Sequence, residues 1–300
     1  MCRLFALTTG EERAQASFWL LDAANNLRHQ SSAHPHGTGI GWFSLGNEPV
    51  LDRAPISALE GTYLEEIARN VRSHTYVCHI RFATAGKVDV RNCHPFTMRE
   101  RLFAHNGCFR DKELIESWLD DRDRALIKGD TDSEVLAAWV THEIERLGDT
   151  TAGIISAIRT VSEQVPVYSL NFLLAESGRV WALRYPDTEE LWMLTPESGG
   201  FGESSDGRRV PAYVFASAKL DDNPHWTLLE SGELVVTDGR THESHHPFGA
   251  LKAPLTLQDL EQSELAGRCV PTGDSGGNAG LAGPAETTAP DLMTCGSGCR

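Results

Sequence analysis

The chain opens with MCRLFALT (residues 1–8), and we expect its apolar part, Leu4–Thr8, to form a strand almost at the terminus. Cys2 lies directly ahead of this strand. Because cysteine is small, the initiator methionine before it can be removed, which leaves Cys2 with a free α-amino group. This amine, with an ordinary pKa of about 7.7 to 8.0, can accept the proton of the thiol on the same residue. A cysteine at position 2 is more often an ordinary thiol, so other residues must support this hypothesis.

The rest of the chain alternates between helical and strand-like patterns. Apolar periodicity predicts helices at 12–27, 59–72, 131–147 and 154–161. Alternation predicts strands at 76–82, 102–104, 167–175, 180–185, 191–194, 212–217 and 227–237. From about Pro254 onward Gly, Ala, Pro, Ser and Thr dominate, and such a composition buries little apolar area. We therefore expect a folded domain over 2–253 and a disordered tail over 254–300, in which Cys295 and Cys299 have no assigned role.

The bulk composition of the 300 residues argues against several classes of partner. Acidic residues outnumber basic ones 42 to 27, giving a net charge of −15, whereas proteins that bind nucleic acid need clustered cations. The sequence contains neither an apolar run long enough to cross a membrane nor a signal peptide. Its seven cysteines are an odd number without a CxxC pair. We therefore expect a cytoplasmic protein that contacts neither nucleic acid nor membrane and acts on a small molecule.

Two segments carry polar groups suited to binding an amino acid. HIRFATAG (79–86) places Arg81 on an alternating strand, and its guanidinium is able to bind a carboxylate through two parallel hydrogen bonds. A structural ion pair is the commoner role of an isolated arginine. GDTDSE (129–134) opens a helix that Asp130 or Thr131 caps, and either Asp130 or Asp132 is placed to hold a substrate ammonium.

Two more segments complete the set. AHNG (104–107) offers the Asn106 side-chain amide beside the Gly107 N–H, and two donors aimed at one point form an oxyanion hole. The Asn-Gly pair is also typical of a turn, and we expect one here after the short strand at 102–104. NCHPF (92–96) is either a rigid wall of a pocket or an ordinary loop.

Taken in this order, Cys2, HxRxAT-x-G, NxHPF, HNG and GDTDSE resemble the class II glutamine amidotransferases of the N-terminal-nucleophile (Ntn) hydrolase superfamily. The motifs cover roughly residues 2–147, and the β-rich stretch to about 239 has the general look of the family. The sequence is most similar to small stand-alone members, such as the ergothioneine-pathway γ-glutamyl amidohydrolase. The resemblance implies an α+β fold, a four-layer αββα sandwich with two antiparallel sheets face to face.

The resemblance also implies a role for each motif residue. Cys2 is the nucleophile and its own amine the base, and Asn106 with the Gly107 N–H forms the oxyanion hole. The glutamyl group is held by Arg81 and Thr84 at its α-carboxylate and by Asp132 at its α-ammonium. The implied reaction is hydrolysis of the side-chain amide of glutamine through a glutamyl thioester on Cys2, without a cofactor or a metal.

Two departures from the family pattern leave the substrate open. The larger, synthase-linked members often carry Trp and His where this chain has Phe82 and Ala85, which makes free glutamine less secure as substrate. We also expect no synthase domain in the tail, so either a separate protein receives the ammonia or the enzyme simply hydrolyses. One alternative is a γ-glutamyl amide hydrolase that removes glutamate from a biosynthetic intermediate. Another is a non-catalytic glutamyl-binding regulatory module.

Overall fold

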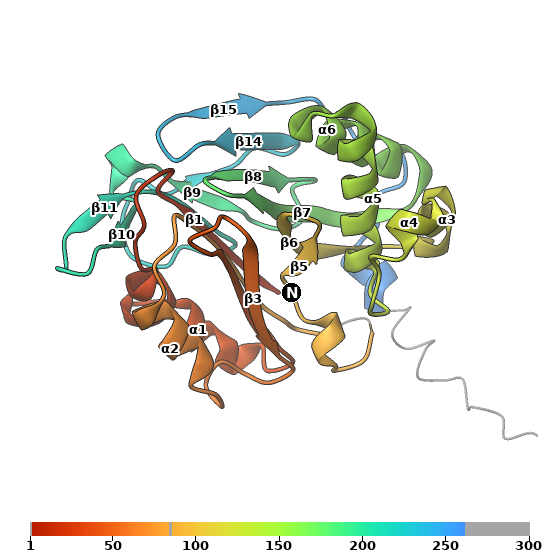
Figure 1. Ribbon diagram of the computed structural model, residues 1–300. Coiled ribbons are helices and arrows are strands. Elements are labelled where there is room, and N and C mark those ends of the chain that lie inside the picture. Colours follow the sequence, from red (N-terminus) through yellow and green to blue (C-terminus); the bar gives the residue numbers. More distant parts are fainter. Residues whose placement is uncertain (1, 84–85, 262–300) are drawn as a thin grey trace, which may run out of the picture.

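Two antiparallel sheets lie face to face in the computed structural model, which describes residues 2–83 and 86–261 (Figure 1). In spatial order, the seven-stranded sheet contains β13 (Thr227–Leu228), β9 (Trp192–Leu194), β12 (Tyr213–Ala216), β1 (Arg3–Thr8), β4 (Thr75–Ile80), β2 (Thr38–Phe43) and β3 (Pro49–Ala54). The six-stranded sheet contains β15 (His242–His245), β14 (Glu233–Thr237), β8 (Arg179–Arg184), β7 (Val167–Glu176), β6 (Arg101–Phe109) and β5 (Phe96–Met98). A two-stranded sheet is formed by β10 (Phe201–Glu203) and β11 (Arg209–Pro211).

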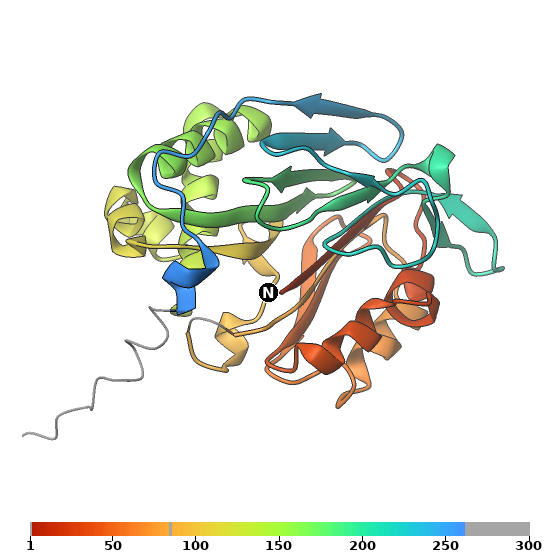
Figure 2. The same cartoon turned by 180° about the vertical axis from the view of Figure 1, so that it is seen from behind.

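Helices cover the outer face of each large sheet. They are α1 (Leu27–Gln30), α2 (Tyr63–Asn70), α3 (Lys112–Trp118), α4 (Asp121–Arg124), α5 (Asp132–Leu147) and α6 (Thr150–Gln164), with short helical turns at Phe18–Asp22, Ser31–Ala33, Val90–Asn92 and Pro196–Ser198. In both views α1 and α2 lie beside the seven-stranded sheet, and α5 and α6 beside the six-stranded one (Figures 1 and 2). The predicted four-layer αββα arrangement is confirmed.

The strand at the start of the chain is buried on both faces. Leu4 and Ala6 pack between the two sheets, whereas Phe5 and Leu7 pack outward beneath the helices. A strand covered on both sides is apolar at every position rather than at alternate ones, which explains the unbroken apolar run after Cys2. The start of this strand lies where the two sheets meet (Figures 1 and 2).

Three predictions about local structure are wrong. The single strand expected at 227–237 is two strands, β13 in the seven-stranded sheet and β14 in the six-stranded one. The helix expected at 12–27 is replaced by an extended segment and two short helical turns, because the backbone of Ala14 and Gln15 hydrogen-bonds to Ser73 and Glu203. The turn expected at Asn106-Gly107 is also absent, because both residues lie inside β6, opposite Asn171 and Leu170 of β7. The register shift in this pair comes later, between Cys108 and Phe109.

The described part of the chain remains against the domain beyond residue 253. Leu255 N donates to Val167 O at 2.8 Å, and Asp259 O accepts from Arg110 Nη2 at 2.8 Å. The boundary at 253/254 stays a prediction, and residues 262–300, including Cys295 and Cys299, lie outside the described residues. Among those described, no helix is both long and apolar enough to span a bilayer.

Candidate active site

Strand pairing brings Cys2 beside Arg81. β1 pairs with β4 so that Arg3 lies opposite Ile80, and the residues one step beyond this pair are Cys2 and Arg81. The Cys2 Sγ accepts from Phe82 N at 3.3 Å and is 3.5 Å from Phe82 O. The Arg81 side chain is buried at 3% exposure, and its Nη1 donates to Lys87 O at 2.9 Å.

Asn106 reaches the same point from the other sheet. Its Oδ1 accepts from Cys2 N at 3.0 Å, a contact between residues 104 positions apart in the sequence. Its Nδ2 is buried without a close hydrogen-bond partner among the described residues, although the Glu189 carboxyl lies near enough to interact with this amide. A buried donor without a partner is costly, so this N–H group is available to a substrate oxygen.

The backbone next to Asn106 has room only for glycine. A Cβ at Gly107 would come within 2.0 Å of Ser169 O on β7, which no side-chain adjustment can relieve. Glycine here serves close strand packing rather than the turn that the sequence suggested.

The first turn of α5 supplies Asp132. Thr131 caps the helix through Glu134 N at 3.3 Å, and Asp132 Oδ2 accepts from Phe109 N at 3.3 Å. The charge of Asp132 is close enough to Cys2 to raise the pKa of the thiol. The structure therefore brings Cys2, Arg81, Asn106 and Asp132 together, whereas Thr84 lies outside the described residues.

The structure distinguishes Asp130 from Asp132, which the sequence left equivalent. Asp130 Oδ1 accepts from Asn92 Nδ2 at 2.6 Å, and Asp130 N donates to Asn92 Oδ1 at 3.0 Å. This reciprocal pair ties the segment at 92–96 to the start of α5. Asp130 therefore has a structural partner, and Asp132 is the carboxylate whose charge acts on Cys2.

Burial raises the pKa of the Cys2 thiol, an effect that the Phe82 backbone hydrogen bond and the positive charge of Arg81 only partly oppose. A thiol with a raised pKa keeps its proton at neutral pH and needs a base to become a nucleophile. Cys2 N, at the head of the site, is the nearest candidate once it is a free amine.

Three histidines from the motif segments line the interior behind the site. The rings of His79 and His94 lie 4.1 Å apart between centroids, and both are buried. The His105 Nδ1 is 2.9 Å from Ser133 Oγ on α5. Burial lowers the pKa of all three, to about 3 for His79, so their charge does not compete with Arg81 for a substrate carboxylate.

Sequence reasoning missed Glu189, which follows β8. Burial raises the pKa of its carboxyl, while Tyr168, Arg3 and Asn106 lower it, so this carboxyl lies near the Asn106 side chain. It belongs to no motif, and no spacing in the sequence connects it to Cys2.

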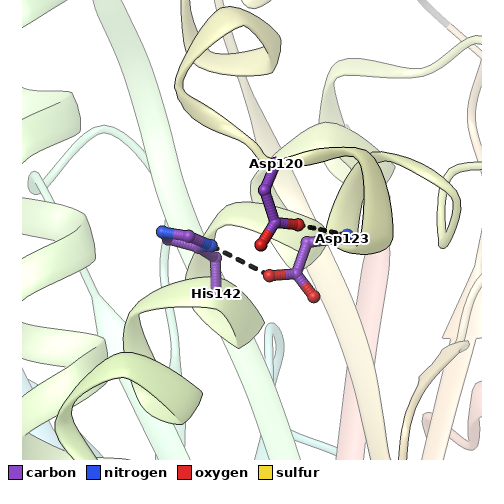
Figure 3. A group of neighbouring side chains, drawn as sticks. All are labelled: Asp120, Asp123 and His142. Carbon is purple, nitrogen blue, oxygen red and sulfur yellow. Dashed lines mark hydrogen bonds and ion pairs between the residues drawn. The ribbon is translucent and has the colours of Figure 1, made fainter.

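One cluster away from Cys2 has side chains of the kind that bind metals, namely Asp120, Asp123 and His142 (Figure 3). Asp120 Oδ1 accepts from Asp123 N at 2.8 Å at the start of α4, and Asp123 Oδ2 is 2.9 Å from His142 Nδ1. The other oxygen of Asp123 binds Arg99. These contacts explain the cluster as a network that holds α4 against α5.

Known proteins with similar sequences point to one family. The family model for class-II glutamine amidotransferases matches residues 1–199. The uncharacterized protein MJ1515 of Methanocaldococcus jannaschii is 32% identical over 232 residues, which are 71% of this chain and 63% of that protein. "Probable glutamine amidotransferase DUG3" of Saccharomyces cerevisiae is 27% identical over 49% of this chain and 47% of its own length. The chain thus spans less than two thirds of the length of either relative.

Solved structures share the fold. A glutamine aminotransferase class-II domain protein from Silicibacter pomeroyi superimposes with a TM-score of 0.60 at 21% identity, over 82% of this chain and 99% of that one. Glutamine phosphoribosylpyrophosphate amidotransferase from B. subtilis gives a TM-score of 0.57 at 18% identity, over 83% of this chain and 50% of that one. With its Ntn-hydrolase fold and a family match over residues 1–199, the chain belongs to the class-II glutamine amidotransferases.

Proposed function

We propose that the protein hydrolyses the side-chain amide of glutamine, with Cys2 as nucleophile after removal of Met1. The observation that carries the proposal is the meeting of Cys2 N and Asn106 Oδ1 at 3.0 Å, with Phe82 N at 3.3 Å from the thiol. The closeness of the thiol, the buried Asn106 amide and the Cys2 nitrogen, which becomes an amine once Met1 is removed, supports the proposal, because a simple binding site does not require all three.

Each residue has a step in the proposed reaction. The α-amine of Cys2 takes the thiol proton, and the sulfur attacks the amide carbon of the substrate. The carbonyl oxygen becomes an oxyanion, which accepts from Asn106 Nδ2 and the Gly107 N–H. The α-ammonium of Cys2 then returns its proton to the departing nitrogen, and ammonia leaves a glutamyl thioester. Water hydrolyses this thioester, giving glutamate and the free thiol.

Substrate binding rests on two charges of opposite sign. The buried guanidinium of Arg81 would hold the α-carboxylate and Asp132 the α-ammonium, and we propose Thr84 as a further carboxylate ligand on the family resemblance alone. A carboxylate and a guanidinium form short, charge-assisted hydrogen bonds with defined geometry. The pair therefore suits the head group of any γ-glutamyl compound. It does not determine which group is attached to the amide nitrogen of the substrate.

Glutamate release from glutamine and from a panel of γ-glutamyl amides tests the proposal. We expect turnover by the wild type and none by Cys2→Ala, and the ranking of substrates separates a glutaminase from a γ-glutamyl amide hydrolase. Intact mass before and after a glutamine-like electrophile should show loss of Met1 and one covalent addition. Retention of Met1 with no addition would instead support the non-catalytic glutamyl-binding module.

The fate of ammonia and the location of the protein are part of the same proposal. Free ammonia formed in equal amount to glutamate by the chain alone would indicate simple hydrolysis, whereas glutamate formation that depends on a second protein would indicate a separate synthase. The described cysteines are free thiols, which supports the cytoplasmic location.

A further inference from the structure

Glu189 is placed beside the site by its backbone. Its carbonyl oxygen accepts from Asn171 Nδ2 at 3.1 Å and from Arg184 Nε at 2.9 Å. Asn171 lies directly opposite Asn106 in the β6–β7 pair, and opposite residues of antiparallel strands project from the same face of a sheet. Asn171 therefore places Glu189 on the face where Asn106 meets Cys2.

The side chain of Glu189 is held as well. It is half-buried, and its Oε1 accepts from the hydroxyl of Tyr168, itself 4% exposed, at 3.1 Å. Its carboxyl lies close enough to the Asn106 side chain and to Arg3 for both to lower its pKa, against the dominant effect of burial. Asn106 in turn contacts Cys2 N at 3.0 Å.

We propose that Glu189 is a positioning residue for the nucleophile. Its carboxylate favours the protonated form of the Cys2 α-amino group and so sets the acid limit of activity. This inference rests on the proposed role of Cys2. A carboxylate near an amine stabilises its ammonium form. Around these two residues, Arg81 and Asp132 act on the Cys2 thiol with opposite signs, and Arg3 acts on the Glu189 carboxyl.

Glu189→Gln tests the proposal, with Glu190→Gln as its matched control. Both substitutions remove one negative charge, but the Glu190 carboxyl is on the exposed side, where its Oε2 accepts from Trp192 Nε1 at 2.9 Å. Two pH profiles are measured for each variant: kcat/KM for glutamine, and the rate of Cys2 alkylation by iodoacetamide, followed on the N-terminal peptide.

We expect Glu189→Gln to move the acid-side midpoint of both profiles to lower pH by about half a unit or more, since a charge removed at short range shifts a pKa by this order. Glu190→Gln should keep the wild-type midpoints. Unchanged midpoints in a folded Glu189→Gln protein, with a wild-type melting temperature, would overturn the proposal. Should Glu189→Gln not fold, Glu189→Ala removes the same charge, and the same midpoints in wild type and Glu189→Ala would overturn the proposal equally.

The two readouts separate this inference from the proposed function. Alkylation depends on the thiol and amine of Cys2 but not on glutamine turnover. If Glu189→Gln shifts the alkylation midpoint but the wild type releases no glutamate, the role of Glu189 is supported and the proposed hydrolysis is contradicted. If the wild type hydrolyses glutamine and Glu189→Gln shifts neither midpoint, only the role of Glu189 is contradicted.

Discussion

Asn106 uses one end of its side-chain amide in this structure, and the proposed reaction uses the other. Oδ1 accepts from Cys2 N, whereas Nδ2 is buried without a close hydrogen-bond partner among the described residues. The two ends have separable functions, because aspartate keeps an acceptor in place of Oδ1 but has no donor to replace Nδ2.

Asn106→Asp should therefore lower kcat by about 100- to 1000-fold, the usual effect of losing one oxyanion donor, with little change in KM. Steady-state kinetics on the pH plateau measures this effect. Asn70→Asp, at the exposed end of α2, makes the same chemical change far from the site and should leave kcat unaltered. A kcat for Asn106→Asp within a few-fold of the wild type would contradict the oxyanion role.

Arg81 should be sensitive even to lysine. The ammonium keeps the charge but cannot form two parallel hydrogen bonds with a carboxylate, so we expect kcat/KM for glutamine to fall by about 10- to 100-fold in Arg81→Lys. Arg53→Lys is the control, because Arg53 on β3 also binds backbone, donating to Cys93 O at 2.8 Å. A similar fall in both variants would show that the loss arises from packing rather than from substrate binding.

At the scale of elements, the contact between Asn92 and Asp130 ties a loop to a helix. It joins the segment at 92–96 to the residues just ahead of α5, whose first residue is Asp132. Asp130→Ala should lower the free energy of unfolding by about 1 to 2 kcal/mol, because it removes the carboxylate that accepts from Asn92 Nδ2. It should also raise KM several-fold, because Asp132 loses its support.

Asp120→Ala provides the comparison for Asp130→Ala. Asp120 caps α4 through Asp123 N at 2.8 Å, so its loss should reduce stability by a similar amount. Because α4 carries no proposed substrate contact, KM should not change. Chemical denaturation and steady-state kinetics on both variants test these expectations. Equal KM values for Asp130→Ala and Asp120→Ala would show that the Asn92–Asp130 pair supports only the fold.

The sequence predicted elements well where one pattern acted alone. The helices α5 and α6 follow their apolar periodicity, and the start of β1 follows its apolar run. The turn at Asn106-Gly107 was wrong because local preference is weaker than pairing with β7. Glu189 could not be found, because it approaches Asn106 only through contacts made after the sheets are assembled.

At the scale of the whole molecule, the interior behind the site holds neutral histidines. His79 and His94 are both buried, and their ring nitrogens have no close hydrogen-bond partner among the described residues. Burial lowers the pKa of His79 to about 3 and that of His94 well below its usual range. An unfolded chain restores both to about 6.5.

The sign of the effect on stability follows directly. Below about pH 6.5 these two histidines bind protons in the unfolded chain but stay neutral in the folded chain. The stability present above this pH is therefore lost progressively as the pH falls toward 3. Two such groups would weaken folding by up to about 3 kcal/mol per pH unit in this window. The interior that keeps positive charge away from Arg81 therefore makes the fold sensitive to acid.

His94→Asn should reduce this pH dependence, because one of the two titrating groups is removed. We expect the slope of unfolding free energy against pH, from urea denaturation between pH 6.5 and 4.5, to become shallower by about 1.4 kcal/mol per pH unit. His225→Asn, on the exposed surface, should keep the wild-type slope. Equal slopes in both variants would mean that His94 is protonated in the folded state. Because this loss accompanies unfolding, it can be separated from titration of Cys2, which changes activity while the protein remains folded.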